Sequence, residues 1–335
     1  MSEFSLIKRY FTRATPGAVL GVGDDAALLR VSSGMELAVS TDMLVSGTHF
    51  FADADPFMLG HKALAVNISD MAAMGAKPCW ATLALSLPAE DDRWLERFSA
   101  GFFALADEYQ VELIGGDTTQ GPLNLSVTIL GEVPQGKALR RDGAKVGDEI
   151  WVSGKLGDAA LALAHMQGRL VLDETGFTAT SAALHRPVPR VALGIALRGI
   201  ASSAIDVSDG LLADLGHILE RSGVAAEIHF NALPVSPTLR HYLSQTQGLS
   251  QIQGLSQTQG LAQTLAKRCV LAGGDDYELC FTAPVARHVD IEKLSAQLDL
   301  PLTCIGKISA GTACIVRAAD GSVMTIGKTG YDHFA

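Results

Sequence analysis

Six short segments of the chain place an aspartate beside glycine, serine or threonine. They are Gly21–Ala27 with Asp24 and Asp25, Ser40-Thr41-Asp42, Asn67–Asp70, Gly115–Thr119 with Asp117, Asp206–Gly210 with Ser208 and Asp209, and Gly273–Glu278 with Asp275. Any one of them is typical of an ordinary turn or helix cap. Together they gather carboxylates and hydroxyls at glycine-flanked positions, mostly at the ends of predicted strands. Such oxygens are the ligands of Mg²⁺, which in turn binds phosphates. The set therefore indicates magnesium-dependent phosphate chemistry.

Asp70 adds to this indication because its helix face is apolar. Asn67 and Asp70 share that face, which also carries Leu64, Ile68 and Met71. A carboxylate near the C-terminal end of a helix meets the unfavourable end of the helix dipole, and its burial is costly without a cation. Asp70 either faces solvent at the helix edge or binds a metal ion, and the other carboxylates favour the metal.

Four further residues have both a structural and a functional interpretation. Ser208 or Asp209 could simply cap the helix that follows, although N–H groups at that helix end could also bind a phosphate. Arg141 follows a glycine-rich turn and could pair with a phosphate, but a surface position explains it at least as well. His49 could contact a substrate, yet a lone histidine carries little weight.

The common nucleotide and hydrolase motifs are missing from the sequence. It has no G-x-x-x-x-G-K-[ST] loop, no H-R-D with D-F-G, no G-x-G-x-x-G between a strand and a helix, and no G-x-S-x-G. If the chain handles ATP, it must do so by a carboxylate-rich scheme.

Composition narrows the function classes. The chain has 335 residues, 48% of them hydrophobic, and a formal net charge of −10. Its length predicts about two domains, and its charge argues against nucleic-acid binding. We expect no transmembrane helix and no signal peptide, because no apolar run is long enough and the first residues include Glu3. The five scattered cysteines indicate reduced thiols in a cytoplasmic protein.

Alternating strand-like and helix-like patterns predict an α/β (α+β) protein. In the N-terminal half we expect the element order β-α-β-α-β. We place the domain boundary after residue 140, so the two predicted domains are 1–140 and 141–335. Asp55-Pro56 predicts a helix start and Gly75 its end. The other expected elements include strands at Leu37–Ser40, Val111–Ile114, Ser203–Val207 and Val270–Gly274, and helices at Pro189–Arg198 and from Asp209 to about Glu220.

A glutamine-rich repeat interrupts the second half. Three six-residue units fill Leu243–Gly260, and a partial fourth extends to Thr264. Six residues are too few for a helical solenoid unit. We expect the segment 243–264 to be a functionally silent expansion of a surface loop.

The motifs, in their order along the chain, resemble those of the thiamine-monophosphate kinase family. The resemblance rests on Gly21-Val-Gly-Asp-Asp-Ala-Ala, Ser40-Thr-Asp-Met-Leu-Val, Lys62–Ala76, Leu113-Ile-Gly-Gly-Asp-Thr-Thr, Ile205-Asp-Val-Ser-Asp-Gly-Leu and Gly273-Gly-Asp-Asp-Tyr-Glu-Leu. It covers nearly the whole chain apart from the repeat. It implies the two-domain fold of aminoimidazole ribonucleotide synthetase, with an N-terminal domain that dimerises through its sheet and a C-terminal α/β sandwich.

The resemblance also implies an activity and a set of roles. The activity is ATP-dependent phosphorylation of thiamine monophosphate to thiamine diphosphate, by a homodimer with several Mg²⁺ ions. The implied metal ligands are Asp25, Ser40, Thr41, Asp42, Asp70, Asp117, Asp206 and Asp209. Gly116, Asp117, Arg141 and Ser208 would contact ATP, and His49, Asp275 and Tyr331 would face the thiamine substrate.

One matched position departs from the family pattern. The family usually has glutamate where this chain has Asp275, one methylene shorter, so a substrate contact there could pass through water. The mechanism expected is direct in-line transfer, which depends mainly on positioning and charge neutralisation. No general base is expected, because the acceptor phosphate is already ionised near neutral pH.

Two other hypotheses about the function remain open. A relative in the same superfamily could act on another acceptor, although the reactive cysteines typical of selenophosphate synthetase and of the hydrogenase maturation protein have no counterpart here. The first cysteine is Cys79, and the sequence ends Asp-His-Phe-Ala. A non-catalytic binder of thiamine phosphates is the other reading, but simple binding does not need so many carboxylates.

Overall fold

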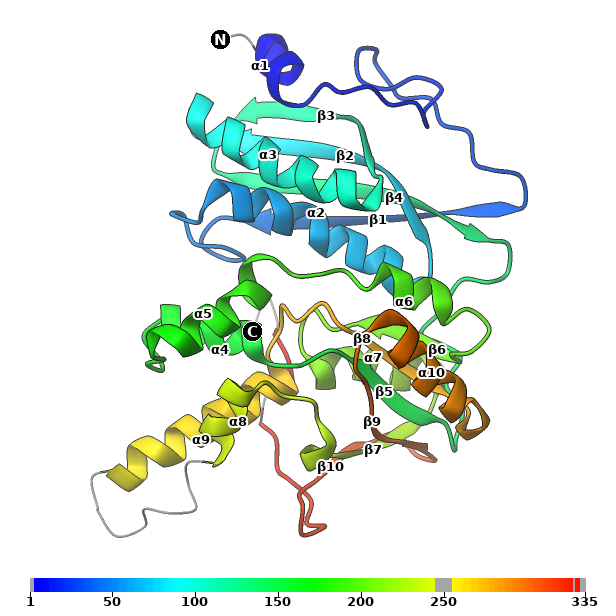
Figure 1. Cartoon of the computed structure of the whole chain (residues 1–335), viewed down its shortest axis with the longest axis vertical. Helices are drawn as coiled ribbons and strands as arrows, with labels where there is room; N and C mark the ends of the chain where they lie inside the picture. Colours follow the sequence, from blue (N-terminus) through cyan, green and yellow to red (C-terminus); the bar gives the residue numbers. More distant parts are fainter. Residues whose placement is uncertain (1–2, 245–254, 328, 332–335) are drawn as a thin grey trace. The chain divides into compact units, whose positions relative to one another are not determined.

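The computed structural model describes residues 3–244, 255–327 and 329–331 (Figure 1). The chain divides into two compact units, 1–138 and 139–335. Within the described ranges, no helix is long and apolar enough to cross a membrane. All five cysteines are free thiols.

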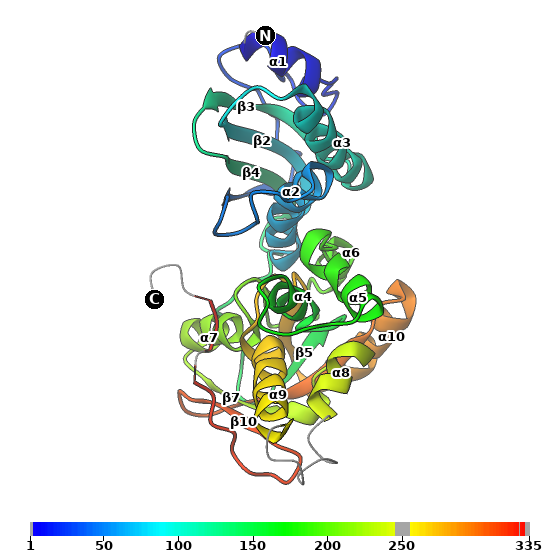
Figure 2. The same cartoon turned by 90° about the vertical axis from the view of Figure 1, so that its left-hand side faces the viewer.

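The first unit is a four-stranded sheet with its two long helices on one face (Figure 2). The strand order is β1-β4-β2-β3, in which β2 and β3 are parallel and the other neighbours antiparallel. The elements are α1 (Glu3–Tyr10), β1 (Met35–Val45), α2 (Pro56–Ala73), β2 (Lys77–Leu87), α3 (Asp92–Tyr109), β3 (Glu112–Gln120) and β4 (Asn124–Pro134). The predicted order β-α-β-α-β corresponds to β1, α2, β2, α3 and β3, and β4 follows them.

Helix α2 begins and ends where its sequence predicts. The Asp55 carboxylate accepts the N–H of Met58 at 3.1 Å, and Pro56 occupies the first turn. Gly75 follows the helix with a φ of +62°, a conformation that favours glycine. Between these ends α2 is buried on nearly all sides, because it packs against both the sheet and α3. The helix is therefore a rigid support for Asn67 and Asp70.

The second unit contains a six-stranded sheet in the order β10-β7-β9-β5-β8-β6. Its elements are β5 (Glu149–Ser153), α4 (Asp158–Met166), α5 (Glu174–His185), α6 (Val191–Ala196), β6 (Ser203–Asp206), α7 (Leu211–Ser222), β7 (Ala225–His229), η1 (Phe230–Ala232), α8 (Pro237–Ser244), α9 (Leu255–Ala272), β8 (Leu279–Ala283), η2 (Val285–Arg287), α10 (His288–Leu298), β9 (Leu302–Ser309) and β10 (Cys314–Arg317).

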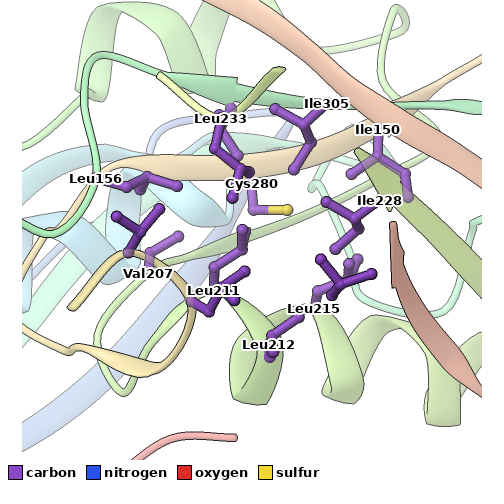
Figure 3. Packing of buried hydrophobic residues seen from close by; sticks show 14 of the residues in the cluster. Ile150, Leu156, Val207, Leu211, Leu212, Leu215, Ile228, Leu233, Cys280 and Ile305 are labelled. Atoms are coloured by element: carbon purple, nitrogen blue, oxygen red, sulfur yellow. The ribbon is translucent and has the colours of Figure 1, made fainter. Parts of the chain in front are cut away.

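One apolar core lies between this sheet and the helices α4, α7, α8 and α9. Figure 3 shows Val207, Leu211 and Leu215 pointing into it beside Ile150 and Cys280. Val207 and Leu211 are both fully buried. Because they lie on either side of Ser208–Gly210, that short loop is fixed at both of its ends.

Two predicted strands are longer than expected. Asp42 and Asp117 lie inside β1 and β3, not at strand ends. Both strands are edges of the four-stranded sheet, where polar residues can stay in the ladder and face water. The apolar pattern therefore stops before the hydrogen-bonded strand does.

The prediction of a strand at Val270–Gly274 was wrong. Residues up to Ala272 belong to α9, in which Cys269, Val270 and Leu271 are buried in the core. A short apolar run fits a buried helix as well as a strand.

The loop predicted at 243–264 was also wrong in part. Its first two residues end α8, and residues 255–264 belong to α9, while 245–254 lie outside the described residues. Elsewhere the differences are small: the helix predicted at Pro189–Arg198 is the shorter α6.

Candidate functional site

In the first unit, Ser40 and Asp70 form a pair of oxygen donors. The Ser40 hydroxyl of β1 donates a hydrogen bond to Asp70 Oδ2 of α2 at 2.5 Å, and both residues are partly exposed. Neighbouring oxygens around Mg²⁺ lie about 3 Å apart, since each is about 2.1 Å from the ion in an octahedron. The hydrogen bond therefore brings together two oxygens of the kind that binds magnesium, at a distance shorter than the spacing of two ligands on one ion.

Asn67 positions Asp42 near this pair. Its side-chain Oδ1 accepts the backbone N–H of Asp42 at 3.1 Å, and its Nδ2 donates to the Ala63 carbonyl at 2.9 Å. Asn67 is buried, so both of these polar groups need protein partners. The bond joins β1 to α2 one turn before Asp70. The shared helix face of Asn67 and Asp70 thus holds the middle of β1.

Thr41 points to the opposite face of the sheet. Its hydroxyl is within 2.8 Å of the Thr128 hydroxyl on β4, and its side chain is exposed. Successive side chains of a strand alternate between faces, so Ser40 and Asp42 face α2 while Thr41 does not. The fold brings Ser40, Asp42 and Asp70 together but leaves the Thr41 side chain apart from them.

Gly116 and Asp117 lie on the other edge strand, β3, next to a register shift in the pairing with β2. Gly116 has a φ of +151°, and a Cβ atom there would lie 1.9 Å from the Leu83 carbonyl oxygen. Only glycine allows this close approach. Asp117, which follows it, is exposed.

Asp42 and Asp117 cannot share one ion. With β4 and β2 between their strands, they are about 14 Å apart at the usual strand spacing of about 4.8 Å. Within the described ranges, no three His, Cys, Asp or Glu side chains gather into a metal-binding group. Any Mg²⁺ in this unit would therefore need hydroxyl, water or phosphate oxygens as well.

Two other predicted residues of this unit lie in loops. Asp25 is exposed in the segment between α1 and β1. His49 follows β1, and its Nδ1 accepts the N–H of Val45 at 3.0 Å. The neutral ring therefore carries its proton on Nε2 and can donate from that side.

In the second unit, Asp214 organises the Ser208–Gly210 loop. Asp214 Oδ2 accepts the backbone N–H groups of Ser208, Asp209 and Gly210, each at 3.0 Å. Burial raises the pKa of Asp214 to about 7, and the charge of Asp209 adds to the rise, while the three N–H bonds oppose it. The loop is thus built around an acidic side chain from the first turn of α7.

This arrangement corrects the prediction for the start of α7. Neither Ser208 nor Asp209 caps the helix; Gly210 is the N-cap residue and provides no side-chain bond. The N–H groups of Ser208–Gly210 are donated to Asp214 and are not left for a phosphate. An anion bound at this loop would therefore need other donors, such as the Ser208 hydroxyl, or bridging cations.

Backbone hydrogen bonds bring four predicted site residues together in this unit. Asp275 donates its N–H to the Ser208 carbonyl at 2.9 Å, and Tyr331 donates its N–H to the Asp209 carbonyl at 3.0 Å. Asp206 ends β6 just before this loop and is buried. Arg141, by contrast, is exposed near the start of the unit.

Asp214 and Arg190 were not among the site residues predicted from the sequence. An aspartate in the first turn of a helix is a recognisable signal, and Asp214 has that position in α7. Arg190 has no local signal, because its partner Glu278 is 88 residues away.

Comparisons with known proteins agree with one another. The family model for the N-terminal domain of AIR synthase related proteins matches residues 23–133. Thiamine-monophosphate kinases of Salmonella typhimurium and Escherichia coli K12 are 47% and 46% identical to the chain, each over 99% of it and 98% of the relative.

Solved structures show the same similarity. A crystal structure of thiamine-monophosphate kinase from Stenotrophomonas maltophilia has a TM-score of 0.83 and 48% identity, over 97% of this chain and 98% of that one. A structure described as AaThiL complexed with AMPPCP and TMP has a TM-score of 0.75 and 31% identity, over 99% and 96%. The fold is therefore that of the AIR synthase related proteins.

Proposed function

Since the chain belongs to the family of thiamine-monophosphate kinases, we propose that it phosphorylates thiamine monophosphate to thiamine diphosphate with ATP, using Mg²⁺ held by its aspartates. The observation that carries the magnesium part is the Ser40–Asp70 pair, whose oxygens lie 2.5 Å apart. The nucleotide and substrate parts are supported by the relative described with AMPPCP and TMP.

The residues fit magnesium because their donors are all oxygens. Ser40, Asp42 and Asp70 would hold one ion in the first unit, and Asp117 on the far edge strand would serve another. Asp25, Asp206 and Asp209 complete the proposed ligand set, whereas the Thr41 hydroxyl faces the other side of the sheet and would not reach the ion held by Ser40 and Asp70. When bound, Mg²⁺ neutralises phosphate charge and acts as a template and Lewis acid.

The chain's own residues supply positioning. Gly116, Asp117, Arg141 and Ser208 are proposed for ATP, and the exposed guanidinium of Arg141 can form paired bonds to a phosphate. His49 would donate from Nε2 to the substrate, because its Nδ1 is engaged by Val45. Asp275 and Tyr331 are proposed for the thiamine substrate.

No residue needs to remove a proton from the acceptor. A monophosphate is already largely ionised at pH 7, because its second pKa is about 6. The transfer is therefore proposed to be direct, from ATP to the substrate phosphate, with no phosphorylated side chain. Recovery of a covalent phosphoprotein from a single turnover would contradict this step.

The activity test is ADP release coupled to a chromatographic assay for thiamine diphosphate. We expect both products in equal amounts with MgATP and thiamine monophosphate, and neither when EDTA is added. ADP release at the same rate with and without thiamine monophosphate would point to another acceptor. Binding of thiamine monophosphate without turnover would point to a non-catalytic binder.

We propose a homodimer formed through the open face of the four-stranded sheet. Leu37, Val39 and Met43 alternate along β1 on the face away from α2 and are exposed. A row of exposed apolar side chains on an edge strand is typical of an interface.

We also propose a cytoplasmic location, which is supported by the five free thiols.

Replacement of Val39 with aspartate is expected to convert the dimer to monomer. Burial of a charge in an apolar interface is costly. The control is Val289→Asp on α10, since both valines are 57% exposed. Sedimentation analysis should give a monomer for Val39→Asp and a dimer for the control. If the unaltered chain sediments as a monomer, the homodimer proposal fails.

A further inference from the structure

The acidic segment between α9 and β8 has an unusual backbone. Asp275 has a φ of +69° and Tyr277 a φ of +49°. Aspartate is tolerated in this conformation, but it is uncommon for a side chain as bulky as tyrosine. Such a residue costs about 1–3 kcal/mol and persists only where the surrounding structure holds it. The two residues on either side of Tyr277 show how it is held.

Asp276 is the first anchor. Both of its carboxylate oxygens lie 2.9 Å from the N–H of Gly157, which precedes α4. The side chain is buried, and this burial raises its pKa well above the ordinary value. A buried acidic group with a single backbone donor ties the segment to the start of α4.

Glu278 is the second anchor. It accepts bonds from Arg190 Nε at 2.7 Å and Nη2 at 2.5 Å, and from the Ser153 hydroxyl at 2.5 Å. The glutamate side chain is 7% exposed and that of the arginine 23%. Two parallel N–H bonds to one carboxylate fix its orientation as well as its position. The anchor joins the segment to the end of β5 and to the residue before α6.

Asp275 differs from these two acids. It is partly exposed, and its Oδ1 accepts the Tyr277 hydroxyl at 3.2 Å. Its N–H bonds the Ser208 carbonyl, and the N–H of Tyr277 bonds the Val207 carbonyl at 2.8 Å. These two bonds therefore hold the backbone around Asp275 and Tyr277 against the loop Ser208–Gly210, which Asp214 organises.

We propose that the three acids divide their roles. Asp276 and Glu278, together with Arg190 and Ser153, are positioning residues that impose the positive-φ backbone. That backbone presents Asp275 to the substrate, so Arg190 acts on substrate recognition through Asp275. The assignment of Asp275 rests on the function proposed above, whereas the anchoring of the segment does not.

The anchoring is tested by hydrogen exchange, which needs no substrate. Arg190→Gln removes the paired bonds to Glu278. Arg190→Lys keeps the positive charge but cannot form two parallel N–H bonds to one carboxylate. In Arg190→Gln the amides of Asp275 and Tyr277 should exchange at least about tenfold faster, with a smaller change in Arg190→Lys. Arg287→Gln, which alters an exposed ion pair, is the matched control and should change neither amide. Unchanged exchange in Arg190→Gln would overturn the anchoring.

The action through Asp275 is tested by steady-state kinetics. Arg190→Gln should raise the KM for thiamine monophosphate by about tenfold, with kcat and the KM for ATP changed far less. In an Asp275→Ala background the same change should add little to KM, because the residue it positions is gone. An equal added effect in both backgrounds would overturn the positioning role. If the unaltered chain does not use thiamine monophosphate, the proposed function and the substrate role of Asp275 fail together, and hydrogen exchange still decides the anchoring.

Discussion

Asp70→Asn is expected to lower kcat by about 100-fold or more, the usual effect of removing an electrostatic contact to a transferred group. The substitution keeps the shape of the side chain and an oxygen that can accept the Ser40 hydroxyl. It removes the charge that would hold Mg²⁺. The Mg²⁺ concentration needed for half-maximal rate should rise as well, because affinity for a hard cation depends on ligand charge.

Asp53→Asn is the matched control for Asp70→Asn. Asp53 is an exposed aspartate in the same unit, so the net charge changes equally. The control should keep full activity, and both variants should unfold at the temperature of the unaltered protein. Full activity of Asp70→Asn at low Mg²⁺ would remove Asp70 from the proposed ligand set. A large loss of thermal stability would point to a packing role instead.

Asp214→Ala is expected to lower the free energy of unfolding by about 3 kcal/mol, from about 1 kcal/mol for each lost hydrogen bond. Three backbone N–H groups would lose their acceptor within a partly buried loop. Because Ser208 and Asp209 belong to this loop, activity should fall as well. Asp214→Asn keeps an oxygen acceptor and should recover most of the stability. Urea unfolding measures both changes.

Asp214 should also make the free energy of unfolding depend on pH. The pKa of Asp214 is raised from 3.8 to about 7 in the folded protein, mainly by burial. Between these values the folded state binds a proton that the unfolded state has lost. The free energy of unfolding should therefore fall as pH rises from about 4 to about 7, and Asp214→Asn should lack this part of the slope.

The control for the stability change of Asp214→Ala is Asp290→Ala in the first turn of α10, where the aspartate is exposed and pairs with Arg287. Its effect should be below about 1 kcal/mol, as for other exposed ion pairs. If Asp214→Ala and Asp290→Ala have equal effects, the loop does not depend on Asp214.

Sequence patterns predicted the elements whose signals are local. Helix α2 has a capping aspartate, a proline in its first turn and a terminal glycine, and its bounds were predicted within a residue. Strands β1 and β3 were predicted too short, because edge strands accept polar residues that end an apolar pattern. The buried end of α9 was taken for a strand, since Val270 and Leu271 belong to an apolar run that fits either structure.

The candidate site was predictable in composition but not in geometry. The spacing of Asn67 and Asp70 indicated a shared helix face, yet only tertiary packing places Ser40 against Asp70. That Thr41 faces away follows from strand alternation, but this required knowing that β1 continues through Thr41. The anchor between Arg190 and Glu278 joins distant parts of the sequence and has no local pattern. The roles of the individual residues remain predictions.

The hydrogen bond from Tyr331 to the Asp209 carbonyl has a consequence for synthesis on the ribosome. The loop at Asp209 emerges early in the second unit, whereas its partners at Asp275 and Tyr331 emerge much later. Contacts between distant segments form slowly, because the intervening chain must first be closed into a loop. The second unit can complete this loop only after nearly all of it has been translated. A chain released before Tyr331 would keep every aspartate of the proposed ligand set and still lack this closing bond.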